Sequence, residues 1–212
     1  FGKMGWQVEM TVPYRDKCII CVAPHTSNWD FIIAELYYHS IGRTAGFLMK
    51  KEWFFWPMGV LFRSMGGIPV ERNRHVSLTD RVAGFLRKKE GFFGRGGLRF
   101  RSMGGIPVER NRHGSLTDRV AEEAMKADRI ELAVTPEGTR SLATKWKRGF
   151  YFIALKAGLP IQLYAIDYKN KRIVCTKELV PSGDVEADMR LIMDYYRPYE
   201  GKYPGKFAVE DI

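Results

Sequence analysis

The feature that most constrains the fold is a run of apolar residues at positions 18–23, which stops at Pro24. A short apolar run that ends at a proline is typical of a strand buried on both faces of a sheet. From about Asn28 the apolar side chains recur at helical spacing, and this second pattern ends near Gly42. A buried strand that leads directly into an amphipathic helix predicts a βαβ unit, and so a sheet with parallel strands.

The same alternation continues along the chain of 212 residues, which is long enough for one α/β domain with a sizeable core. Strand patterns occur at 6–12, 45–49, 130–134, 161–166 and 172–179, and helix patterns at 115–125, 146–155 and from Ser182 or Asp184 to about Tyr196. We therefore expect an α/β fold, with a mostly parallel sheet covered by helices on both faces. The tail from Pro198 is expected to be poorly ordered.

One segment of the sequence occurs twice. Residues 45–82 reappear with few changes as residues 83–120. Solenoid folds need at least three such units, so we expect residues 1–212 to form a single domain with a duplicated insertion at about 63–100 or 83–120. Each glycine of the second copy costs about 1 kcal/mol inside a helix, which predicts that residues 84–100 form no stable helix.

Either copy could supply its Ile-Pro-Val sequence to the sheet as a strand. The first copy has the better helix in front of it. The second copy continues directly into the helix pattern at 115–125 and the strand at 130–134, which makes an uninterrupted βαβ unit. We therefore expect residues 106–108 to enter the sheet, with Arg110 rather than Arg72 at the strand end.

Residues 53–62 form an unusually aromatic segment, with two tryptophans and three phenylalanines. One interpretation is a core helix kinked at Pro57. The other is an interfacial segment that lies at headgroup depth in a membrane, flanked by Lys50, Lys51 and Arg63. The combination of aromatic and basic residues favours the membrane interpretation.

The net charge indicates what kind of partner the protein binds, and the cysteines indicate the compartment in which it works. The formal net charge of +10 predicts attraction to an anionic partner, and no nucleic-acid-binding signature accompanies it. An anionic phospholipid surface is therefore the expected partner, and no nucleic acid is expected. The three cysteines lie within strand patterns rather than in a disulfide framework, so we interpret them as core residues of a cytoplasmic protein, peripheral on the inner face of the membrane.

The strand at 18–23 is followed by His25 and, five positions later, by Asp30. Open α/β folds place reactive groups at the carboxyl ends of their strands, where His25 could act as a general base oriented by Asp30. The alternative is structural, because Ser27 and Asp30 have the spacing of a helix capping box. No Gly-x-Ser-x-Gly motif is present, so no serine nucleophile is expected, and His25 would activate the hydroxyl of a substrate directly.

Three further motifs follow His-x4-Asp in the sequence. Gly-Gly-Ile-Pro-Val-Glu-Arg precedes the Glu-Gly-Thr-Arg sequence at 137–140, and Gly-Leu-Pro-Ile follows at 158–161. With all four motifs in this order, from about Gly5 to about Tyr196, the chain resembles the glycerolipid acyltransferases, the 1-acylglycerol-3-phosphate acyltransferase family. The resemblance implies that family's α/β fold and a catalytic pair of His25 and Asp30. It assigns acceptor binding to Arg110 or Arg72, Glu137, Gly138, Thr139 and Arg140, and Lys50 is a candidate for a further phosphate contact.

The expected reaction moves a fatty acyl group from acyl-CoA or acyl carrier protein to the free hydroxyl of a lysophospholipid. With 1-acylglycerol-3-phosphate as acceptor, the product is phosphatidate. No cofactor beyond this co-substrate is expected, and no cluster of residues has the spacing of metal ligands. The alternatives are the same fold acting on another lipid acceptor, and a non-catalytic basic domain that binds membranes.

Overall fold

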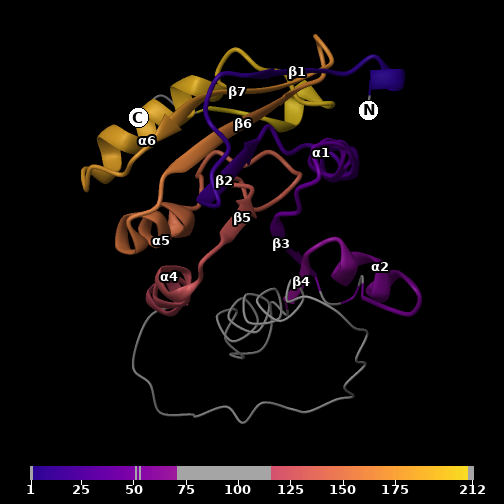
Figure 1. Cartoon of the computed structure of the whole chain (residues 1–212). Helices are drawn as coiled ribbons and strands as arrows, with labels where there is room; N and C mark the ends of the chain where they lie inside the picture. Colours follow the sequence, from indigo (N-terminus) through magenta and orange to yellow (C-terminus); the bar gives the residue numbers. More distant parts are fainter. Residues whose placement is uncertain (1, 51, 53, 71–115, 210–212) are drawn as a thin grey trace.

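A computed structural model describes residues 2–50, 52, 54–70 and 116–209 (Figure 1). Its strands are β1 (Gln7–Met10), β2 (Lys17–Ala23), β3 (Gly46–Lys50), β4 (Gly67–Val70), β5 (Ile130–Val134), β6 (Ile161–Asp167) and β7 (Arg172–Leu179). Its helices are α1 (Asn28–Ser40), α2 (Met58–Ser64), α4 (Leu116–Lys126), α5 (Gly149–Ala157) and α6 (Val185–Tyr196), with 3-10 turns η1 (Gly2–Met4) and η3 (Pro204–Lys206). The expected strands and helices that fall within the described residues are confirmed, with ends that differ by up to three residues.

The strands form one sheet in the order β1-β7-β6-β2-β5-β3-β4. The five strands from β6 to β4 run parallel to one another, while β7 pairs antiparallel with β6 and β1 pairs parallel with β7. The α/β fold with a mostly parallel sheet is therefore confirmed. The antiparallel pair follows from the short turn after Asp167, which is too short for a crossover helix.

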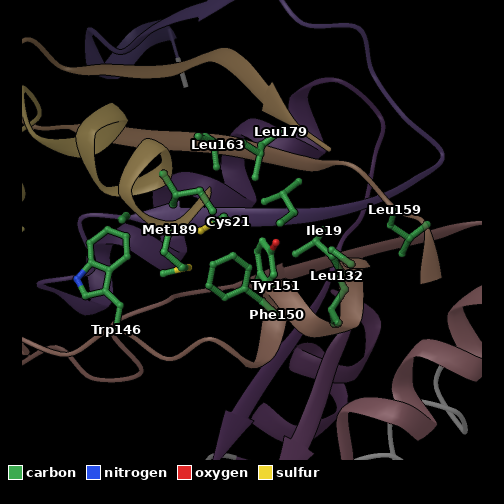
Figure 2. Packing of buried hydrophobic residues seen from close by; sticks show 14 of the residues in the cluster. Ile19, Cys21, Leu132, Trp146, Phe150, Tyr151, Leu159, Leu163, Leu179 and Met189 are labelled. Atoms are coloured by element: carbon green, nitrogen blue, oxygen red, sulfur yellow. The ribbon is translucent and has the colours of Figure 1, made fainter. Parts of the chain in front are cut away.

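Strand β2 lies between β6 and β5 and is buried on both faces, as its unbroken apolar sequence requires. Ile19 and Cys21 face one layer, where they pack with residues of α4, α5 and α6; Figure 2 shows them beside Tyr151 and Met189. The alternate residues Cys18 and Ile20 face the other layer, which α1 covers. Helices thus cover both faces of the sheet.

The edge strand β4 comes from the first copy of the duplicated segment. Its residues Gly67–Val70 pair in parallel with β3. The first copy follows β3 through α2 within a short connection, and this local route delivers the strand to the neighbouring edge. The expectation that residues 106–108 also enter the sheet stays a prediction. Residues 106–108 and the segment 84–100 lie outside the described residues.

The aromatic segment is not a core helix kinked at Pro57, and its side chains are divided between the core and the solvent. Helix α2 begins only after Pro57, so the proline marks the helix start. Phe62 is buried, and its ring centroid lies 6.0 Å from that of Phe54. Trp56 is 85% exposed, and Val60 and Leu61 are also exposed. One face of the segment therefore packs on the domain, and the other presents apolar side chains to solvent.

Two further expectations concern the cysteines and the chain end. Cys18, Cys21 and Cys175 are free and buried, which confirms them as core residues. The expectation of poor order from Pro198 was wrong for residues 198–209, because Gly201 is buried against Thr26 of the loop after β2. Among the described residues, no helix is long and apolar enough to cross a membrane.

Candidate active site

The candidate site lies where β2 and β5 end side by side. These strands are parallel neighbours, with Cys21 opposite Val134, so the loops that follow them meet at the same edge of the sheet. The helix that follows β2 covers one face of the sheet, and α5, which follows β5, covers the other. Ligands of open α/β sheets bind outside such a switch point. The topology thus brings the loop of His25 next to that of Glu137.

The loop after β2 turns directly into helix α1. Ser27 is the N-cap, and its side chain accepts a hydrogen bond from the backbone N–H of Trp29. Asp30 completes a capping box, because its Oδ2 accepts the backbone N–H of Ser27 at 2.8 Å and that of Thr26 at 2.7 Å. The capping interpretation of Asp30 is therefore confirmed. A negative charge at this position is also favoured by the helix dipole.

The same carboxylate also faces the histidine. Nδ1 of His25 lies 3.3 Å from Oδ2 of Asp30, and the two side chains are 20% and 1% exposed. The capping role and a role beside the histidine are thus compatible, because capping fixes the carboxylate where the imidazole can reach it. With Nδ1 turned toward Asp30, Nε2 is the nitrogen left to meet a substrate.

Glu137 holds the histidine loop from the neighbouring strand end. Its Oε1 accepts the backbone N–H of His25 at 2.9 Å, and its Oε2 is buried with no hydrogen-bond partner in the part of the chain that the structure describes. Burial raises the pKa of Glu137 to about 7, although the hydrogen bond from His25 opposes this shift. The carboxyl of Glu137 is therefore bonded to the histidine loop.

A tight turn carries the rest of the Glu-Gly-Thr-Arg motif outward. Gly138 has a φ of +65°, and a Cβ there would lie 3.3 Å from Cγ of Lys147, so the turn suits glycine. Thr139 is half-buried, with its Oγ1 accepting the backbone N–H of Ser141, and Arg140 is exposed. Lys147, whose stem covers Gly138, is a cation beside the motif that the sequence did not single out.

Three predicted cations are not placed in the site. Arg72 and Arg110 lie outside the described residues, and Lys50 is described only through its backbone at the end of β3, where it pairs with Val70. Their roles in acceptor binding stay predictions. The described residues bring together His25, Asp30 and Glu137.

Sequence reasoning missed the residues that support this loop from a distance. The hydroxyl of Tyr168, just after β6, donates to Oδ1 of Asp30 at 2.7 Å. The hydroxyl of Tyr196 in α6 donates to the carbonyl oxygen of Cys21 at 2.6 Å, and the backbone N–H of Tyr203 donates to Oγ1 of Thr26 at 3.2 Å. No local pattern marks these tyrosines, because each partner is more than a hundred positions away in sequence.

His39 lies on the exposed side of α1. Its Nε2 is 3.7 Å from Oε2 of Glu35, one helical turn away, and its side chain is half-exposed. This pair belongs to the helix surface. Over the ranges that the structure describes, no group of three or more histidine, cysteine or carboxylate side chains could hold a metal ion.

Comparison with known families agrees with this geometry. The model of the acyltransferase family matches residues 8–93 and again residues 78–167, which together cover most of the chain and define it as an acyltransferase. The protein belongs to the glycerolipid acyltransferase family. Each match contains one copy of the duplicated segment, as a tandem duplication requires. Neither a curated protein nor a solved structure matches the chain.

The buried carboxyl of Glu137 predicts a pH-dependent stability. Below pH 4.5 it is protonated in both the folded and the unfolded chain. Above that pH the unfolded chain ionises first, so stability falls until the folded carboxyl ionises at about pH 7. Wild type should therefore lose about 3 kcal/mol relative to Glu137→Gln between these pH values, measured by urea unfolding.

The control is Glu122→Gln, which changes an exposed carboxyl on α4. Its stability should follow that of wild type across the same pH range. A difference between wild type and Glu137→Gln that does not vary with pH would refute the assignment of the shifted pKa to Glu137.

Proposed function

We propose that the protein transfers a fatty acyl group from acyl-CoA or acyl carrier protein to the free hydroxyl of a lysophospholipid, with 1-acylglycerol-3-phosphate as the acceptor. The observation that carries this proposal is the His25–Asp30 pair, with 3.3 Å between Nδ1 and Oδ2, at the carboxyl edge of the sheet in an acyltransferase. The pair is the arrangement of a general base and its orienting carboxylate.

The proposed reaction uses the imidazole twice. Nε2 of His25 takes the proton of the acceptor hydroxyl as its oxygen attacks the thioester carbonyl carbon, and Asp30 stabilises the imidazolium that forms. The tetrahedral intermediate then collapses, the carbon–sulfur bond breaks, and the leaving thiolate takes the proton back from His25. The products are the acylated lipid and the free thiol, without a covalent enzyme intermediate. No group other than the two substrates is required.

The acceptor's phosphate is proposed to bind on the cationic side of the site. Arg140 is exposed at the turn that leads away from Glu137, and Lys147 lies over Gly138 in the same turn. A guanidinium can bind a phosphate through two parallel hydrogen bonds. With Arg110 or Arg72 and Lys50 added, as the family resemblance implies, this edge would hold a doubly charged phosphate monoester.

The protein is proposed to work as a peripheral protein on an anionic membrane, at the inner face in the cytoplasm. Phe55, Trp56, Val60 and Leu61 are exposed around α2, and α1 exposes Trp29, Ile32 and Leu36. The two helices touch, since the ring centroids of Phe31 and Phe62 lie 6.3 Å apart. Lys202 lies 4.9 Å from the centroid of the Trp29 ring, and Arg63 lies over the Phe54 ring. Apolar side chains with cations among them suit the lipid headgroup region.

The catalytic part of the proposal is tested by His25→Ala. The rate of acyl transfer from labelled acyl-CoA to lysophosphatidate, measured as the release of CoA, should fall by about 10²- to 10⁴-fold, because the general base is lost. His39→Ala is the matched control, since it removes the other described histidine from the same helix–loop unit and should keep full activity. Transfer that survives in His25→Ala, with folding unchanged by circular dichroism, would refute the mechanism. Membrane binding without any turnover in wild type would favour the non-catalytic alternative.

The choice of acceptor is tested by Arg140→Ala. Loss of the guanidinium should raise KM for lysophosphatidate by about tenfold, which corresponds to one charge-assisted hydrogen bond. A lysolipid acceptor that lacks a phosphate monoester should be used equally well by wild type and variant. If wild type prefers that second acceptor, the alternative of another lipid substrate on the same fold is correct.

The membrane surface is tested by Trp56→Glu and Val60→Glu. Both changes put a charge where an apolar side chain would meet lipid, and should weaken cosedimentation with phosphatidylglycerol-containing vesicles by about tenfold or more. Val180→Glu is the control: Val180 is equally exposed but follows β7, whose Leu179 pairs with Ile161 at the opposite edge of the sheet. Equal losses in all three variants would count against this surface.

A further inference from the structure

The carboxylate of Asp30 is enclosed by donors from several segments. Its Oδ2 accepts the backbone N–H groups of Thr26 and Ser27 and lies 3.3 Å from Nδ1 of His25. Its Oδ1 has a single described hydrogen bond, from the hydroxyl of Tyr168 at 2.7 Å. Because the two loop amides hold only Oδ2, the bond to Oδ1 fixes the rotation of the carboxylate about its Cβ–Cγ bond.

Tyr168 is itself anchored on two sides. Its ring packs edge-on against Trp6, with 5.2 Å between the ring centroids. Its backbone N–H donates to the carbonyl oxygen of Glu200 at 2.9 Å, and Lys169 forms an ion pair with the Glu200 side chain. The end of β6 is thereby fastened to the segment 200–203.

The segment 200–203 also presses on the loop that carries His25. A Cβ on Gly201 would lie 2.8 Å from Oγ1 of Thr26, and the N–H of Tyr203 donates to that same oxygen. The segment 200–203 therefore contacts two residues that donate to Asp30. It contacts Tyr168 through Glu200, and Thr26 through Gly201 and Tyr203.

The hydroxyl of Tyr168 can act only as a donor here. Its burial, and next its hydrogen bond to Asp30, raise the pKa of Tyr168 well above that of a free phenol. It keeps its proton wherever an imidazole titrates, so it is no base or acid for the reaction. It also does not compete with the imidazole for Oδ2.

We infer that Tyr168 is a positioning residue for the catalytic pair: it locks the Asp30 carboxylate so that Oδ2 faces Nδ1 of His25 and selects the tautomer with the proton on Nδ1. This tautomer leaves Nε2 unprotonated and ready to accept the proton of the lipid hydroxyl. The kinetic part of the inference rests on the proposed function. The tautomer itself does not.

The test is nitrogen NMR of the imidazole in protein labelled with ¹⁵N-histidine, where the chemical shifts of the two ring nitrogens report which one carries the proton. The His25 signals are assigned by their loss in His25→Gln. Wild type should show the Nδ1–H form of neutral His25. Tyr168→Phe, which removes only the hydroxyl, should shift the population toward the Nε2–H form.

Tyr195→Phe is the matched control. The Tyr195 hydroxyl donates to the carbonyl oxygen of Val174 and accepts the N–H of Thr176, so its loss also removes buried hydrogen bonds but leaves Asp30 untouched. All samples contain trimethylamine N-oxide, which keeps destabilised variants folded. In the transfer assay Tyr168→Phe should lower kcat about tenfold or more with KM unchanged, and Tyr195→Phe should not.

Each outcome decides the matter. An unchanged tautomer in Tyr168→Phe, an equal change in Tyr195→Phe, or an Nε2–H form in wild type would overturn the assignment. A tautomer change confined to Tyr168→Phe supports it. If that change is seen while wild type transfers no acyl group to any acceptor, the positioning role stands and the proposed function fails.

Discussion

A carboxylate that is 1% exposed must be surrounded by donors, and this requirement at Asp30 shapes much of the molecule around it. The donors come from the loop after β2 and from the end of β6, and the C-terminal segment supports that loop through the hydrogen bond from Tyr203 to Thr26. Each donor is fixed by a different part of the fold. The charge that caps α1 therefore ties together three stretches of chain that are far apart in sequence, with the histidine at their centre.

Short stretches of sequence predicted those parts of the arrangement that depend on interactions between neighbouring residues. The apolar run of β2, the capping box at Ser27 and the strand before Glu137 are all visible in short windows, and the rule for parallel sheets brings the two loops together. Tyr168 and Gly201 could not be found in this way. One is a tyrosine after a strand and the other a glycine in a tail, and only the long-range packing gives them a role.

Sequence reasoning had little to separate the two copies of the duplicated segment. It favoured the second copy because that copy runs without interruption into α4 and β5. Within the described residues, β4 comes from the first copy, which reaches the edge beside β3 through the short helix α2. Residues 45–70 close an edge of the sheet with local connections, and loop closure over a short distance costs less entropy than over a long one. The two family matches overlap at residues 78–93, across the junction of the two copies, and each match includes one complete copy.

The contact between Gly201 and Thr26 determines what the protein would lose if its C-terminal segment were removed. Helix α6 finishes at Tyr196, and a shortened version that stops there would keep every strand of the sheet. It would nevertheless lose the backbone that bears on the histidine loop, and with it the partner of the Tyr168 amide. Selection that acts on the candidate site should for that reason also act on residues 200–203, a segment that carries no motif and no helix or strand and that packs against the outside of the site.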